Sequence, residues 1–110
     1  MKAGEYRPSD LLRGTEIPDD LLRALPKTDL HCHIVGTLRP ATLADLARRH
    51  GLALPRPADA LYTFASFYDF LDVLNLAAKA LREREDFARM AYEAVEDGFR
   101  LGNMLHAEFL

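Results

Sequence analysis

Residues 25–40 read LPKTDLHCHIVGTLRP, and this stretch decides the fold because it places two histidines, His31 and His33, in an extended segment. The pattern predicts a β-strand over 27–34. Successive side chains of a strand point to opposite faces, so the two imidazoles share one face. A glycine and a proline follow, and they are expected to end the strand. The pair then lies at the C-terminal end of the strand, where α/β barrels build their sites, and it suits two ligands of one metal ion.

The rest of the chain is predicted to be mostly helical, after a polar segment over 1–17 that we expect to be loosely held. Apolar residues recur at helical spacing, and Ser66 with Asp69 forms a capping pair at a helix start. Pro26 and Gly51 are expected to stop helices. We expect helices over 19–25, 40–50, 67–81 and from 87 to Gly98 or Gly102, a loop over 52–59, a charged solvated break over 82–85, and a buried strand over 104–110. The apolar face of the third helix is predicted to consist of Phe67, Phe70, Leu71, Leu74, Ala78 and Leu81.

The order of strand, several helices and strand predicts an α/β fold in which two parallel strands are joined by a helical crossover. Two parallel strands do not make a sheet that can bury both faces. The second predicted strand also reaches Leu110, the last residue of the sequence. We therefore expect residues 1–110 to be the N-terminal part of a larger single-domain protein.

Composition and charge exclude several classes of protein. The 110 residues are 49% hydrophobic and 28% charged, as in an ordinary folded domain, and the net charge of −3 is mixed along the chain. Without a basic stripe, nucleic acid is not expected as a partner. No apolar run approaches the roughly 20 residues that span a bilayer, so no membrane partner is expected. Cys32 is the single cysteine, which excludes an intrachain disulfide and favours a reducing, cytoplasmic setting. The sequence gives no indication of the oligomeric state.

Residues 25–40 closely resemble the opening signature of the adenosine deaminase family, which usually reads L-P-K-x-E-L-H-x-H-L-D-G-(S/T)-L-x-P. About a dozen of the sixteen positions agree, which makes the match far more specific than a bare His-x-His. Weaker similarities follow at Asp69-Phe70-Leu71, Met90-Ala91-Tyr92-Glu93 and His106-Ala107-Glu108-Phe109. The resemblance thus extends over roughly residues 25–110.

The resemblance implies the N-terminal part of a zinc-dependent (β/α)₈ TIM barrel, ending after the second strand, that deaminates a small-molecule purine by hydrolysis. His31 and His33 match the first two Zn²⁺ ligands. Phe67, Phe70 and Leu71 match the wall of the substrate pocket. A water activated by the zinc ion attacks the carbon that carries the amine, because zinc lowers the pKa of its water to about 7. The family's other ligands and its catalytic residues have no counterpart here, so no catalytic residue is assigned and the chain alone is expected to lack activity.

Val35 departs from the family pattern. The family has an acid at this position, and in the adenosine enzymes that acid contacts the sugar hydroxyl of the nucleoside. Valine cannot accept a hydrogen bond, so we expect weakened ribose recognition. The substrate therefore stays open between adenosine, adenine and a modified purine. Asp29 replaces the usual Glu, which is a milder change.

Two other functions fit parts of the sequence. The segment 29–33 also fits a metal-dependent phosphoesterase of the polymerase-and-histidinol-phosphatase type, although residues 36–40 follow the deaminase pattern. A non-catalytic relative is the third alternative, and Val35 favours it.

The remaining polar positions are interpreted structurally. Cys32 faces away from the two histidines of the predicted strand and is expected to be a small buried hydrophobe. His50 is expected to interact with the dipole at the end of its helix. His106 and Glu108 share a strand face and are expected to pack in a polar part of the core.

Overall fold

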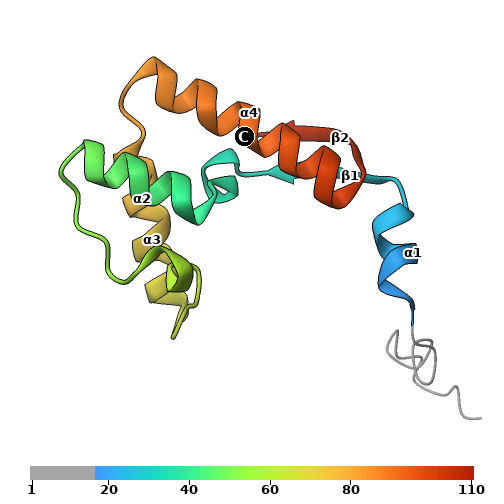
Figure 1. Cartoon of the computed structure of the whole chain (residues 1–110), viewed down its shortest axis with the longest axis horizontal. Helices are drawn as coiled ribbons and strands as arrows, with labels where there is room; N and C mark the ends of the chain where they lie inside the picture. Colours follow the sequence, from blue (N-terminus) through green and yellow to red (C-terminus); the bar gives the residue numbers. More distant parts are fainter. Residues whose placement is uncertain (1–16) are drawn as a thin grey trace, which may run out of the picture.

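The computed structural model describes residues 17–110, so the expectation for the first sixteen residues lies outside the described part. Figure 1 shows α2, α3 and α4 gathered at one end, the two strands beside the second half of α4, and α1 at the other end. The elements in chain order are α1 (Asp19–Ala24), β1 (Lys27–Cys32), the 3₁₀ turn η2 (Ile34–Thr37), α2 (Pro40–Arg49), the 3₁₀ turn η3 (Ala58–Ala60), α3 (Phe67–Ala80), α4 (Arg84–Gly102) and β2 (Met104–Phe109). Each predicted helix and strand is present, and η3 is added within the predicted loop and its margin.

The two strands pair in parallel, as predicted, and the helices α2, α3 and α4 form the crossover between them. The register joins Asp29 to Ala107 and Cys32 to Phe109, with an irregularity between these two pairs. Backbone hydrogen bonds continue the pairing past the strand end, since the Leu110 N–H donates to the Cys32 carbonyl over 2.8 Å. The pairing therefore holds the end of β1, where the two histidines lie, against the end of β2.

The predicted strand over 27–34 is two residues too long, because β1 ends at Cys32. The chain turns into η2 directly afterwards. The Gly36 N–H donates to the His33 carbonyl over 2.9 Å, and the Thr37 hydroxyl donates to the Ile34 carbonyl over 2.6 Å. These local hydrogen bonds compete with strand pairing. His33 itself keeps an extended backbone, with φ −73° and ψ 104°, so its side chain still follows the alternation of the strand.

Local sequence signals explain where the helices begin and end. Pro40 occupies the first turn of α2, where its missing N–H has no intrahelical partner, and Gly51 follows the helix with φ +67°. The Ser66 hydroxyl caps α3 by accepting a hydrogen bond from the Asp69 N–H over 3.1 Å, which confirms the predicted pair. Asn103 ends α4 in the left-handed conformation, with φ 49°.

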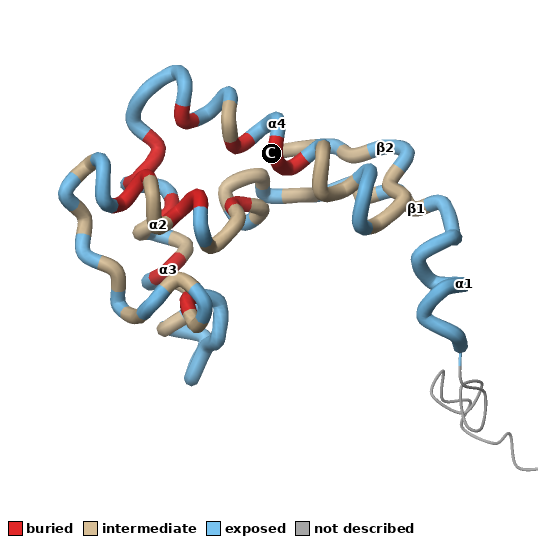
Figure 2. Tube along the Cα trace, viewed as in Figure 1, coloured by how far each residue is buried: buried red, intermediate tan, exposed pale blue. Residues whose placement is uncertain are grey.

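The hydrophobic core lies between the three longer helices and η2, and not under the two strands (Figure 2). Burying one leucine or valine side chain stabilises a fold by about 1.5–3 kcal/mol, so this cluster dominates the packing. Its members are Leu38, Leu43, Leu46, Leu61, Val73, Ala77, Ala80, Leu81 and Met90. The core therefore anchors η2, which follows His33.

The predicted buried face of α3 is wrong in most of its residues. The buried residues of this helix are Val73, Ala77 and Ala80, whereas Phe67 is 68% exposed and Phe70 is 37% exposed. Small side chains let helices approach closely, so α3 packs through its valine–alanine edge and leaves its bulky edge outside the core. Of the predicted face, Leu81 alone is buried, and it follows the last helical residue.

The second strand is also more exposed than predicted. Leu105 of β2 is 68% exposed, and no residue of the strand is buried. Within residues 17–110 the strand has one neighbouring strand and α4 beside it, which leaves the rest of its surface uncovered. The leucines of α1 are exposed as well. In the described part of the chain, no helix is long and apolar enough to cross a membrane.

Ion pairs join α2 to α4 and hold the exit of η2 in place. Arg39 lies between η2 and α2, directly before the first residue of α2. Its guanidinium contacts Asp97 over 2.6 Å and Glu96 over 2.7 Å. Their carboxylates raise the pKa of the Arg39 guanidinium, so this cation stays charged. Deeper between the helices, the Thr42 hydroxyl donates to the buried Glu93 carboxylate over 2.6 Å.

Candidate metal centre and adjoining pocket

His31, in β1, and His33, directly after β1, bring their rings close together. The Nε2 atoms of His31 and His33 lie 3.1 Å apart, and the ring centroids are 5.1 Å apart. Both side chains are exposed to solvent. The Asp29 carboxylate accepts a hydrogen bond from the His31 backbone N–H over 3.0 Å, which fixes the chain just before the pair. The prediction that the two rings share one side of the strand is therefore confirmed.

The geometry of the pair fits two ligands of one metal ion. Two nitrogens on a tetrahedral zinc ion lie about 3.3 Å apart, because Zn–N bonds are about 2.0–2.1 Å long. The observed separation of 3.1 Å is close to this value. Without a metal, the same separation corresponds to a hydrogen bond in which one ring N–H donates to the bare nitrogen of the other ring. Within residues 17–110, no group of three or more His, Cys, Asp or Glu side chains is placed to hold a metal, so the pair would supply two ligands.

Cys32 lies between the two histidines in the sequence but does not complete the set. Its thiol is free and half-buried. Burial raises the pKa of the Cys32 thiol, and the nearby Asp29 carboxylate raises it further. Within residues 17–110, no three possible metal-binding side chains lie together, so Cys32 adds no third ligand to the pair.

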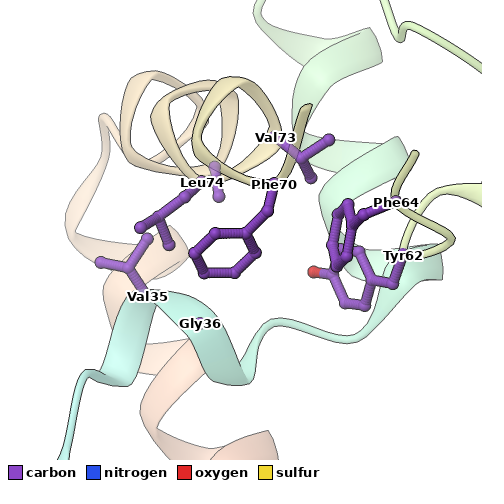
Figure 3. Close-up of a pocket in the computed structure, with 8 residues that line it drawn as sticks. Val35, Gly36, Tyr62, Phe64, Phe70, Val73 and Leu74 are labelled. Atoms are coloured by element: carbon purple, nitrogen blue, oxygen red, sulfur yellow. The ribbon is translucent and has the colours of Figure 1, made fainter. Parts of the chain in front are cut away.

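A pocket of about 110 Å³ lies between η2, the segment that follows η3, and α3. It begins two residues after His33, at Val35 and Gly36. Figure 3 shows the Phe70 ring between Val35 and Leu74 on one side and Tyr62 and Phe64 on the other. Its lining consists of Val35, Gly36, Tyr62, Phe64, Phe70, Val73, Leu74 and Ala77, and it contains no charged side chain.

Arg56 holds the aromatic wall of the pocket. Its guanidinium lies 5.8 Å from the centre of the Phe64 ring, contacts Asp69 at the start of α3 over 2.9 Å, and donates to the Ala60 carbonyl over 2.9 Å. The Phe64 ring meets the Phe70 ring edge-on, with centroids 5.3 Å apart.

The profile of the adenosine deaminase family matches residues 26–109. This chain belongs to the adenosine deaminase family. It is 40% identical over 85 residues to the aminodeoxyfutalosine deaminase of Acidothermus cellulolyticus, covering 74% of this chain and 24% of that protein. It is 37% identical over 93 residues to the adenine deaminase of Hahella chejuensis, covering 81% of this chain and 28% of that protein.

A solved structure also resembles the chain. The crystal structure of adenine deaminase from Arthrobacter aurescens matches with a TM-score of 0.65 and 34% identity, covering 78% of this chain and 27% of that one. This confirms the predicted fold class, in which the two parallel strands and their helical crossover form part of a (β/α)₈ barrel. The chain spans about a quarter of the length of these relatives.

The resemblance implies three side chains for the wall of a substrate pocket, and one of them lines the pocket found here. Phe70 lines it. The Phe67 ring lies 6.0 Å from the Phe70 ring, outside the lining, and Leu71 is half-buried outside it. The role of all three in substrate binding stays a prediction. Sequence reasoning missed Tyr62 and Phe64, which a density of aromatic residues over 62–70 would have indicated.

Two of the structural interpretations need correction. His50 follows the end of α2, as predicted. Its ring contacts the buried Asp86 carboxylate over 2.8 Å, so this side chain also makes a tertiary contact in addition to any interaction with the helix dipole. His106 and Glu108 share a contact of 3.3 Å, but both side chains are exposed, so the predicted polar core packing is wrong. The reason is that the side chains of β2 are largely uncovered in the described part of the chain.

Proposed function

We propose that this chain is the N-terminal part of a longer, zinc-dependent hydrolase that deaminates a purine. The observation that carries this proposal is the 3.1 Å separation between the His31 and His33 ring nitrogens, two residues before a pocket that begins at Val35. The family membership supports it, as do relatives named adenine deaminase and aminodeoxyfutalosine deaminase. The family match favours this reaction over phosphate-ester cleavage.

In this proposal, His31 and His33 hold the zinc ion through their Nε2 atoms, and the third and further ligands come from outside these residues. When bound, zinc supplies Lewis acidity and lowers the pKa of a water to about 7. Water adds at the carbon that bears the amine, and ammonia leaves, so the purine gains an oxygen in place of nitrogen. No residue of this chain is assigned to the proton transfers.

The pocket takes part in holding the purine. A purine is flat, and the faces and edges of Phe70 and Phe64 offer the contacts that such a ring prefers. Val35 offers no acceptor for a sugar hydroxyl, so the proposal favours adenine or a modified purine over adenosine. A reducing cytoplasmic setting, in which Cys32 stays a thiol, is part of the proposal.

The test is ammonia release by the full-length protein that contains this chain, purified with zinc. Adenine, adenosine and a phosphate monoester are offered in parallel. Ammonia from a purine, lost on removing the metal with a chelator and restored by zinc, is the expected result. Phosphate release without ammonia would instead support the phosphoesterase alternative, and no turnover of any substrate would support the non-catalytic one.

A further inference from the structure

The side chains of β1 do not alternate strictly, and the break falls directly before the histidine pair. Half-buried and exposed residues alternate over 27–30. His31 should then be half-buried like Asp29, but it is exposed, and Cys32 is half-buried instead. We propose that Asp29 is a positioning residue, which holds this break in the strand and so turns the His31 ring to the side of the His33 ring. This inference rests on the proposed function, because it takes the two histidines as zinc ligands.

The register of the sheet identifies the break as a β-bulge. Two residues lie between Asp29 and Cys32 of β1, whereas one residue lies between their partners in β2, Ala107 and Phe109. The first strand therefore contains one extra residue at this point, and an extra residue shifts the alternation of side chains by one position. Bulges re-aim side chains and are common beside active sites.

The bulge places His31 on the opposite side of the sheet from Asp29. Ala107 and Phe109 are half-buried and line a hollow against α4, so their partners Asp29 and Cys32 lie on the same side of the sheet. The exposed His31 lies on the other side, with its Nε2 atom 3.1 Å from that of the second histidine. Without the extra residue, His31 would turn toward α4 and the two rings would separate.

One hydrogen bond from a side chain holds the bulge. The extra residue of a bulge is left out of the regular pairing between strands. Here the His31 N–H donates to the Asp29 carboxylate over 3.0 Å. Aspartate and asparagine are short enough to accept a bond from a backbone N–H two residues further on, and the glutamate that the family signature usually has here is one carbon longer.

Asp29 acts on the metal site through His31 and not as a ligand. Within residues 17–110, no three possible metal-binding side chains lie together, so the Asp29 carboxylate does not join the histidine pair. Groups that orient a metal ligand contribute to metal affinity, and their loss typically weakens it by about ten- to a hundredfold.

Zinc binding by the full-length protein, measured by competition with a chelator of known affinity, tests the inference. Asp29→Val removes the acceptor and suits a β-strand, so it should keep the thermal stability of the protein and weaken zinc binding about tenfold or more. A role in stability alone would change both quantities together. Asp29→Asn removes the charge but keeps an acceptor oxygen at the same distance from the backbone. It should bind zinc within about threefold of the parent.

The absorption spectrum of bound Co²⁺ provides a second measurement, because it depends on the number and arrangement of the ligands. It should change in Asp29→Val and stay the same as that of the parent in Asp29→Asn. Asp20→Ala, which removes an exposed acid from α1, is the control and should change neither the zinc affinity nor the spectrum. Asp29→Ala also lacks the acceptor and is the second variant if Asp29→Val does not fold.

The outcomes separate this inference from the proposed function. If the variants without the acceptor bind zinc as tightly as the parent, with the same cobalt spectrum, and His31→Ala loses the metal, the role of Asp29 is overturned and the zinc site stands. If Asp29→Asn weakens zinc binding as much as Asp29→Val, the charge acts and not the hydrogen bond, which also overturns the inference. If the parent binds no zinc, the proposed zinc-dependent function fails, and the inference fails with it.

Discussion

The ring of His50, at the end of α2, lies 2.8 Å from a carboxylate oxygen of Asp86, which is completely buried at the start of α4. The same carboxylate accepts hydrogen bonds from the Glu83 and Arg82 backbone N–H groups, over 3.0 and 3.1 Å, and contacts Arg49 over 3.1 Å. The Glu83 N–H contributes most to lowering the pKa of Asp86, and with the His50 ring and the other donors it holds that pKa at about 2. One side chain thus caps α4 and ties it to α2.

Asp86→Asn should lower the free energy of unfolding of the full-length protein by about 2–3 kcal/mol, because it removes a buried charge-assisted hydrogen-bond acceptor and a helix cap. The pH dependence has a definite sign. The folded pKa of Asp86 lies below its ordinary value of 3.8, so the carboxylate stabilises the fold above about pH 4, and this contribution is lost as the pH falls toward 2. Chemical denaturation at pH 7 and pH 3 measures both effects. The variant should lose less stability on acidification than the parent.

The matched control for this prediction is Glu85→Gln, which also removes one acid from the first turn of α4 but at an exposed position. It should change stability by less than about 0.5 kcal/mol. If acidification lowers the stability of the parent and of Asp86→Asn equally, protonation of the Asp86 carboxylate is not what destabilises the fold at low pH.

Short sequence signals predict much of this fold, and the rest depends on contacts between residues that are distant in the sequence. The period of two in the strand brings His31 and His33 together, and the Ser66–Asp69 pair starts α3, because both depend on neighbours within a few residues. The partner of His50 was not predictable, since Asp86 lies 36 positions further along the chain. The buried edge of α3 was misassigned for a similar reason. Periodicity shows that a helix has apolar edges, but the packing partner decides which edge is covered.

The residues of the pocket also divide into those that the sequence predicts and those that it does not. Phe70 follows from its place in a recognised motif, whereas Tyr62 and Phe64 belong to an irregular segment whose path depends on Arg56 and on a hydrogen bond to Leu38. Loop conformations of this kind carry no periodic signal in the sequence.

His31→Ala and His33→Ala, each made in the full-length protein, should reduce bound zinc to a small fraction of one per chain and reduce purine deamination at least a hundredfold. Each change removes one of the two nitrogens that lie 3.1 Å apart. Metal content after dialysis and ammonia release are the two measurements. His106→Ala is the control, because this histidine is exposed on β2 and lies outside the pair. Full zinc content with normal turnover in both variants of the pair would refute their role as ligands.

Val35→Asp should increase kcat/KM for adenosine relative to adenine, because it restores an acceptor where the family has an acid. We expect a relative gain of about tenfold or more, measured as the ratio of the two kcat/KM values in parent and variant. Val35→Asn, similar in size but uncharged, is the matched control and should give a smaller gain. A strong adenosine preference in the parent that Val35→Asp leaves unchanged would show that another residue recognises the sugar.

The 110-residue chain expressed alone should aggregate or remain loosely packed, without deaminating purines. Large apolar side chains lie on its surface, among them Phe67 of α3, Phe99 of α4 and Leu105 of β2, each 68–69% exposed. Within residues 17–110, β1 and β2 pair with each other and leave one edge each unpaired, which favours association between chains. Light scattering, dye binding to exposed apolar surface and thermal unfolding followed by circular dichroism measure this state, with the full-length protein as the reference. A sharp cooperative transition in a monomer that holds one tightly bound zinc ion would show instead that these residues form a complete domain.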